Sequence, residues 1–150
     1  MLEATDTQLI VEFEVEGLAV PKQRARVSTD RNGNTHAYYA NRSRNSKRLS
    51  YPEYMQLVIA QCTNALRNAP GYYGGADIVG CYRIEVDSYR TSLQGDWDNL
   101  GGTFSDALQG LIWCDDKQII EGEVKKFLVK RSKDCRVVIR VLRVRIPGLI

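Results

Sequence analysis

The spacing of apolar residues divides the chain into regular segments. Residues 8–16 alternate, with Leu9, Val11, Phe13 and Val15 separated by polar side chains, as in a strand with one wet face. Runs rich in β-branched and aromatic residues predict further strands over 78–89, 118–130 and 135–146. We expect the last two to be antiparallel neighbours, joined by a polar turn around Ser132 to Asp134.

Two other segments repeat their apolar residues at steps of three and four, which predicts helices over 52–68 and 97–109. Ser50 is positioned to cap the first helix, with Pro52 and Glu53 in its first turn. The expected apolar stripes are Met55, Val58, Ile59, Cys62 and Leu66 on the first helix, and Trp97, Leu100, Phe104 and Leu108 on the second.

Residues 22–48 show no sustained period and form a long basic loop, which we expect to be mobile and functional. The Asn32-Gly33 pair indicates a turn, which a hairpin would explain. The resulting order of elements predicts an α+β fold: one domain over residues 1–150, with a mixed β-sheet and helices mainly on one face.

Composition is consistent with one ordinary globular domain. The chain has 150 residues, of which 43% are hydrophobic and 26% charged, so it can bury a core and is not disordered throughout.

The sequence has no apolar run long enough to span a bilayer and no secretory signal pattern, so we expect a cytoplasmic protein. The four cysteines are too widely spaced for a zinc ribbon, and we expect them to be reduced and structural.

The net charge of +3 hides a segregation of charge along the chain. Residues 1–20 carry five acids and no base, residues 21–48 carry eight bases and one acid, and residues 91–116 carry five aspartates and no base. Residues 117–145 are again basic. Basic regions on both sides of an acidic centre suit a polyanionic substrate with a metal site between them. Ordinary solvated surface charge is the competing interpretation.

Four aspartates in residues 95–118 carry the candidate chemistry. Asp96 and Asp98 precede or begin the second helix, and Asp115 and Asp116 follow it, so the two pairs can meet at one end of that helix. Gathered carboxylates supply the oxygen ligands that Mg²⁺ prefers. Without a cation such a cluster repels itself. Alternatively, Asp98 only caps the helix and the Asp115-Asp116 pair forms a surface turn.

The stretches DWDNLGGTFSDALQG and IWCDDKQIIEGEVKK resemble the signature of the RusA family of Holliday junction resolvases. That signature has a D-x-D-N start, a helix leading to D-A-L, and D-D-x-Q before a strand that ends in lysine. EGLAVPKQRARV is similar to the family's first strand and basic loop, so the resemblance covers most of residues 11–145. It implies a homodimeric endonuclease that nicks opposed strands of a four-way junction with Mg²⁺ or Mn²⁺, and it suggests a bacterial or phage origin.

By position, the resemblance assigns metal binding and catalysis to Asp96, Asp98 and Asp116, with Asp115 in the same acidic cluster. One departure concerns a lysine that the family usually carries four residues after the second aspartate, because Gly102 stands there. Lys125, Lys126 or a base of the 22–48 loop are the candidate replacements.

The function we expect is a Mg²⁺-dependent, structure-specific endonuclease acting on branched DNA, in recombination and repair. The strongest competing hypothesis is a degenerate relative that binds branched DNA without cutting it, which the Gly102 departure favours. Two further alternatives are a nuclease with a different branched or flapped substrate and an acidic-patch interaction module. Phosphate contacts are expected from the bases of the loop and of one later strand, because such contacts set affinity and not sequence. These residues are Lys22, Arg24, Arg26, Arg42, Arg44, Lys47, Lys125 and Lys126.

Overall fold

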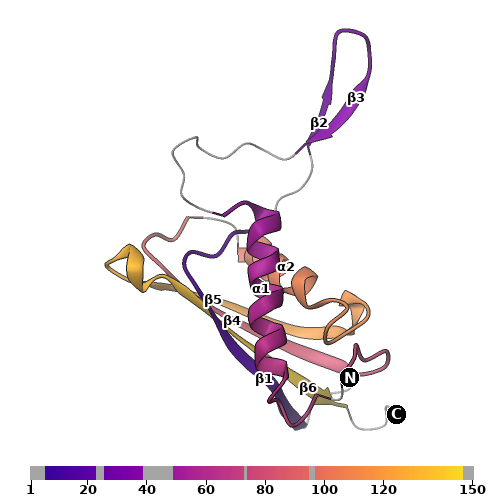
Figure 1. Ribbon diagram of the computed structural model, residues 1–150, viewed down its shortest axis with the longest axis vertical. Coiled ribbons are helices and arrows are strands. Elements are labelled where there is room, and N and C mark those ends of the chain that lie inside the picture. The colour runs from indigo at the N-terminus through magenta and orange to yellow at the C-terminus, as the bar shows by residue number, and fades with distance from the viewer. Residues whose placement is uncertain (1–5, 23–25, 39–48, 73, 95–96, 147–150) are drawn as a thin grey trace.

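A computed structural model describes residues 6–22, 26–38, 49–72, 74–94 and 97–146, with the side chains of Arg26, Tyr38 and Asp98 outside the description. The main body is a four-stranded sheet with two helices packed on it, and a separate hairpin stands away from that body (Figure 1). The elements are β1 (Asp6–Glu16), β2 (Arg26–Thr29), β3 (Thr35–Tyr38), α1 (Tyr51–Leu66), β4 (Cys81–Arg90), α2 (Trp97–Leu108), β5 (Ile119–Leu128) and β6 (Arg136–Arg145).

The main sheet is mixed, and its strand order is β1-β6-β4-β5. β4 and β5 are parallel, whereas β6 is antiparallel to both of its neighbours. The helices cover one face of the sheet, where Val15, Val86 and Ile139 are fully buried among residues from α1 and α2. The predicted α+β fold, with a mixed sheet and helices on one face, is therefore confirmed.

The expectation that β5 and β6 are neighbours is wrong. β4 lies between them, and the amide of Val129 after β5 donates to the carbonyl of Arg90 at the end of β4. The connection therefore continues past the end of β4, through the short 3₁₀ turn Ser132–Asp134, before β6 begins on the other side. Strand patterns show which face is buried, but they do not show which strand comes next in the sheet.

α1 begins as the sequence predicts. The Ser50 side chain accepts from the Glu53 amide and the Glu53 side chain accepts from the Ser50 amide, which together form a capping box. The helix buries Tyr54, Val58, Cys62 and Leu66 at steps of four against the sheet and α2. Tyr54 also meets Phe104 of α2 edge-on, with ring centroids 6.1 Å apart. These contacts fix α1 beside β1 and α2 beside β5.

The basic loop contains the expected hairpin, formed by β2 and β3. Asp30 organises its turn by accepting from the amides of Asn32 and Asn34, and Gly33 adopts a positive φ of 82° there. Every side chain described between Val27 and Ala37 is exposed. The hairpin therefore projects from the main body, and its own turn and the pairing of β2 with β3 hold it together (Figure 1).

Candidate functional site

α2 is the central element of the candidate site. Leu100, Phe104 and Leu108 are completely buried and hold the helix against the sheet. Buried Thr103 donates its hydroxyl to the carbonyl of Val20 at 2.7 Å, which ties the segment after β1 to the helix. Asp98 is the second residue of α2, so the backbone places it in the first turn. Asp96 lies outside the described residues.

Trp97 departs from the expected apolar stripe. Its side chain is 56% exposed, and its indole Nε1 donates to the carbonyl of Val124 on β5 at 3.0 Å. β5 is an edge strand, and the indole satisfies one of its carbonyl groups. The expectation that Trp97 is a core residue is wrong, because the helix begins over the edge of the sheet and not over its middle.

The Asp115-Asp116 turn is held in place by Gln118. The buried Gln118 side chain makes four hydrogen bonds: its Oε1 accepts from the amides of Cys114 and Asp115, and its Nε2 donates to the carbonyls of Asp77 and Gly80. The glutamine of the D-D-x-Q motif thus anchors the two aspartates to the loop that precedes β4.

Asp115 and Asp116 are both exposed, but they have different local roles. Asp115 caps the 3₁₀ turn Asp116–Gln118 by accepting from the amide of Lys117 at 2.9 Å. That hydrogen bond holds the pKa of the Asp115 carboxyl below its ordinary value. Asp116 follows in the first position of the turn, exposed to solvent. Both are carboxylate groups of the kind that a hard divalent ion binds.

The backbone of Asp98 and the Asp115-Asp116 turn lie toward opposite ends of α2. From Asp98 to Leu108 the helix rises about 15 Å, and the chain then turns through Gly110 to reach Asp115 beside the start of β5. By contrast, the contact of Trp97 with Val124 places the beginning of α2 beside the middle of β5, away from the start of that strand. Among the described residues, no three acidic, histidine or cysteine side chains gather closely enough to hold a metal ion. Within one chain the backbone of Asp98 is therefore apart from the Asp115-Asp116 turn. The meeting of the two pairs of aspartates stays a prediction, because Asp96 and the Asp98 side chain lie outside the described residues.

Lys125 and Lys126, both expected to contact DNA, point to opposite faces of the sheet because they are consecutive strand residues. Lys125 lies on the face away from the helices, where its Nζ is 3.4 Å from Glu123 Oε1. Lys126 lies on the side of the helices and donates to the carbonyl of Leu93 at 3.0 Å. Only Lys126 shares a face with α2.

Lys22 lies directly on α2. Its amide donates to the carbonyl of Asn99 at 2.9 Å, and its Nζ lies 2.9 Å from Asp106 Oδ2. Tyr51, at the start of α1, donates to the same carboxylate oxygen at 3.4 Å. Asp106 therefore joins the segment after β1 and the start of α1 to α2. Of the other expected DNA contacts, Arg24, Arg42, Arg44 and Lys47 lie outside the described residues, and only the backbone of Arg26 is described, in β2.

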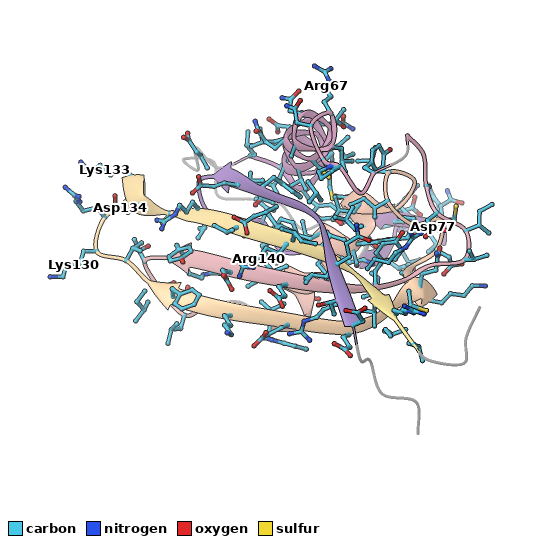
Figure 2. The ribbon with its side chains drawn as sticks, turned by 90° about the horizontal axis from the view of Figure 1, so that it is seen from below. Arg67, Asp77, Lys130, Lys133, Asp134 and Arg140 are labelled. Carbon is cyan, nitrogen blue, oxygen red and sulfur yellow. The ribbon has the colours of Figure 1, made fainter. Side chains whose placement is uncertain are left out.

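The basic excess of residues 117–145 is largely neutralised within the sheet. On the face away from the helices, Arg140 pairs with Glu85, Asp87 and Glu12, and Arg136 pairs with Glu14. Arg83 on β4 likewise contacts three glutamates: Glu85, Glu121 and Glu123. Arg140 lies midway along the sheet, between Lys133 at one end and Asp77 at the other (Figure 2). These arginines stabilise the sheet and are not a free basic surface.

Asp77 is a partly buried carboxylate in the loop before β4. It accepts from the Tyr82 hydroxyl at 2.7 Å, from the Val79 amide at 3.1 Å and from Arg143. Burial raises the pKa of the Asp77 carboxyl, but these hydrogen bonds outweigh it and lower that pKa to about 2. No sequence signal marks it, since its partners come from separate strands.

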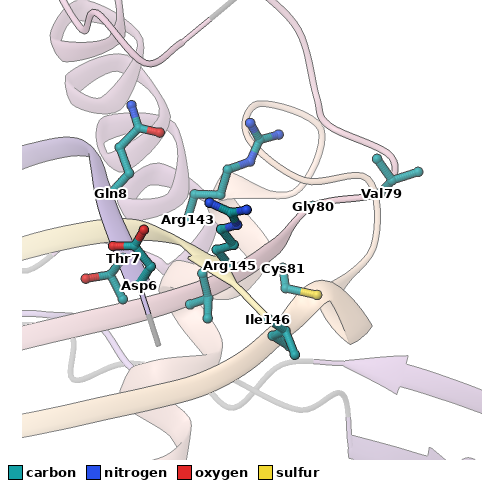
Figure 3. A pocket seen from close by; sticks show the side chains of 10 residues that line it. Asp6, Thr7, Gln8, Val79, Gly80, Cys81, Arg143, Arg145 and Ile146 are labelled. Carbon is teal, nitrogen blue, oxygen red and sulfur yellow. The ribbon is translucent and has the colours of Figure 1, made fainter. Parts of the chain in front are cut away.

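A pocket of about 510 Å³ opens beside this cluster, between the start of β1 and the end of β6. Arg143 and Arg145 point into it near Gln8 and Cys81 (Figure 3). Arg143 is already engaged by Asp77, and Asp6 is the carboxylate in the lining. The pocket therefore lacks a gathered set of metal-binding groups among the residues described.

A comparison with known families identifies the family of the chain. A family model described as Endodeoxyribonuclease RusA matches residues 16–142. The chain belongs to the RusA family. No curated protein matches the chain. The matched region contains α2, the Asp115-Asp116 turn and the hairpin, so the elements assembled above are those of a RusA nuclease.

RusA membership implies an endodeoxyribonuclease of the kind that resolves Holliday junctions. Nucleases of this family generally use a divalent metal ion, which agrees in kind with the carboxylates on α2 and on the turn that follows it. Neither described helix has the length and apolar character needed to cross a bilayer.

Proposed function

We propose that this RusA protein is a Mg²⁺-dependent endonuclease that resolves Holliday junctions by paired, symmetrical nicks during recombination and repair, in the cytoplasm of a bacterium or a phage-infected cell. The observation that carries the proposal is the match over residues 16–142 combined with the anchored, exposed Asp116 turn. Mn²⁺ is the alternative ion, since it accepts the same oxygen ligands.

Asp96, Asp98 and Asp116 would hold the ion, with Asp115 beside them. When bound, the ion supplies an activated water and neutralises charge on the scissile phosphate. The residues of the chain do the positioning: the buried face of α2 fixes Asp98, and the four hydrogen bonds of Gln118 fix the turn that carries Asp116. All of these donors are carboxylate oxygens, which fits Mg²⁺ in kind.

We further propose that each site is completed across a homodimer. Asp98 and Asp116 lie at opposite ends of α2, and a two-fold axis that sets two α2 helices antiparallel brings Asp98 of one chain to Asp116 of the other. The edge formed by β5 and the start of α2 suits this interface because it exposes Trp97, Ile120 and Leu128. The opposite edge strand, β1, is more polar: it exposes Glu12, Glu14 and Glu16, of which the first two pair with Arg140 and Arg136.

DNA would approach the side of the molecule that carries the helices and the hairpin. The opposite face of the sheet is occupied by the ion pairs of Arg83, Arg136 and Arg140 and carries an excess of carboxylates, which disfavours a polyanion. The hairpin projects Arg31 and His36 from the body, and the basic residues from Lys22 to Lys47 flank it. Contacts of this kind follow the shape and charge of a branch and not its sequence.

The alternative is a branched-DNA-binding protein without cleavage, favoured by Gly102 in place of the family lysine. A labelled four-way junction and a linear duplex, each incubated with Mg²⁺ or Mn²⁺ and with wild-type or Asp98→Asn protein, separate the two functions. Paired symmetrical nicks in the junction, lost in the variant, support the proposal. Junction binding in EDTA with no nicking in either metal would establish the alternative.

A further inference from the structure

Lys22 occupies the space over the α2 position at which the family carries its lysine. A Cβ added to Gly102 would lie 3.0 Å from Lys22 Cδ and 3.5 Å from Lys22 Cβ. The aliphatic part of Lys22 thus packs on the bare backbone of Gly102. A side chain at position 102 would require Lys22 to move, so the glycine and the lysine are complementary.

The backbone that leads into Lys22 is fixed to the helix. The Lys22 amide donates to the Asn99 carbonyl at 2.9 Å, and the Val20 carbonyl accepts from the buried Thr103 hydroxyl at 2.7 Å. Two hydrogen bonds to α2, from residues two apart in the segment, therefore hold Lys22 over the first turns of the helix.

Residues 98, 102 and 106 are four apart in sequence, so they follow one row along the helix at intervals of slightly more than one turn, about 6 Å. The aliphatic part of the Lys22 side chain passes over Gly102, the middle residue of this row. Its Nζ ends beside Asp106, about one turn nearer the C-terminal end of the helix. Asp98 lies one turn the other way. A lysine side chain anchored over Gly102 can turn its ammonium toward either end of the row.

We propose that Lys22 supplies the ammonium that the family's helix lysine supplies elsewhere, and that Asp106 holds this ammonium when DNA is absent. The inference rests on the proposed nuclease function. With junction DNA bound, Lys22 transfers from Asp106 to a phosphate oxygen beside Asp98 and stabilises the charge that develops during cleavage. The Lys22–Asp106 pair is 42% and 31% exposed, and exposed pairs of this kind contribute little, so a phosphate can displace the carboxylate.

Three variants test whether Lys22 replaces the helix lysine of the family. They are Lys22→Met, Gly102→Ala, and the double variant Lys22→Met/Gly102→Lys, which returns the lysine to the helix. Lys133→Met serves as the control, because it removes an exposed lysine from the distant turn between β5 and β6. For each protein, kcat and KM for a labelled four-way junction in Mg²⁺ are measured with the urea midpoint of unfolding.

We expect Lys22→Met to lower kcat about 100-fold with a much smaller change in KM, and the double variant to recover most of that loss. Gly102→Ala should lower kcat by about tenfold through displacement of Lys22, although its urea midpoint should not fall, since alanine favours a helix more than glycine does. Lys133→Met should match the wild type.

The result that would overturn this inference alone is wild-type nicking that persists at full kcat in Lys22→Met. A loss in Lys22→Met that appears only in KM would overturn it as well, because Lys22 would then be an ordinary phosphate contact. Absence of nicking by the wild-type protein would overturn the proposed function and this inference together.

Discussion

The side-chain amide of Gln118 donates to the main-chain carbonyl of Asp77 at 2.9 Å, and this contact joins the turn that carries Asp116 to the loop before β4. The same amide donates to Gly80, and the Gln118 Oε1 accepts from the amides of Cys114 and Asp115. The glutamine of the D-D-x-Q motif therefore acts on the backbone. It determines where the Asp116 carboxylate stands.

Replacing Gln118 with leucine tests that role. The leucine fills a similar volume but removes four hydrogen bonds. The Cys114 amide and the Asp77 carbonyl keep their bond to each other, whereas the Asp115 amide and the Gly80 carbonyl lose the Gln118 side chain as a partner, so we expect the free energy of unfolding to fall by about 2 kcal/mol. Junction nicking should fall further than stability explains, because the Asp116 turn loses its anchor. Urea unfolding and nicking at a temperature at which the variant is folded measure both effects. Lys117→Gln, at the exposed neighbouring position, should change stability little.

Asp77 predicts how stability depends on pH. Because its folded pKa of about 2 lies below the ordinary value of 3.8, its contribution is present above pH 4 and is lost as the pH falls toward 2. The side chain is 16% exposed, so the shift corresponds to about 2 kcal/mol. Asp77→Asn should be less stable than the wild type by about that amount at pH 7, and by about half of it at pH 3. Urea unfolding at both values checks this, and an equal difference at both would contradict it.

Local patterns predicted the elements well because each pattern depends on neighbours in the sequence. The capping box of Ser50 and Glu53 is set by a spacing of three residues, and the hairpin turn is set by Asn32 and Gly33. The D-D-x-Q motif also indicated a turn, which the structure contains as the Asp116–Gln118 3₁₀ turn. These features require no knowledge of the rest of the fold.

Relationships between distant segments could not be predicted in the same way. Periodicity did not show that β4 separates β5 from β6, and it placed Trp97 in the core although the helix begins at the sheet edge. Counting charges did not show that Arg140 pairs with carboxylates on β1 and β4. The contact of Lys22 with Asp106 likewise depends on the path of the chain after β1, which no local pattern describes.

The β5 edge gives a prediction about association. If the dimer forms there, Leu128→Lys, at a side chain that is 62% exposed, should place two like charges near each other across the two-fold axis and weaken the dimer. Sedimentation equilibrium should show a shift toward monomer, and nicking should fall with it. Leu9→Lys is the matched control, because Leu9 is 50% exposed on β1 at the opposite edge. Dissociation by the control and not by Leu128→Lys would place the interface on β1.

The hairpin gives a prediction about affinity. Arg31 is exposed at its turn, and we expect it to bind a phosphate, so Arg31→Gln should raise the Kd for the junction without lowering kcat at saturating DNA. The slope of log Kd against log salt should fall by about one. Arg131→Gln, which removes an exposed arginine paired with Asp134 at the far turn, should leave both quantities unchanged. An unchanged salt slope in Arg31→Gln would exclude the hairpin turn from the DNA interface.

Mixing two inactive variants tests whether each site is shared between subunits. Suppose that each site takes Asp98 from one chain and Asp116 from the other. In a dimer of one Asp98→Asn chain and one Asp116→Asn chain, both substitutions then fall in the same site, and the second site keeps both aspartates. Each variant alone should be inactive, whereas the mixture, after subunit exchange, should recover nicking of one strand at a time. Sites built within single chains would both be damaged in the mixed dimer and would recover nothing. Because Asp98 and Asp116 lie at opposite ends of α2, we expect recovery, read as single nicks in a labelled junction.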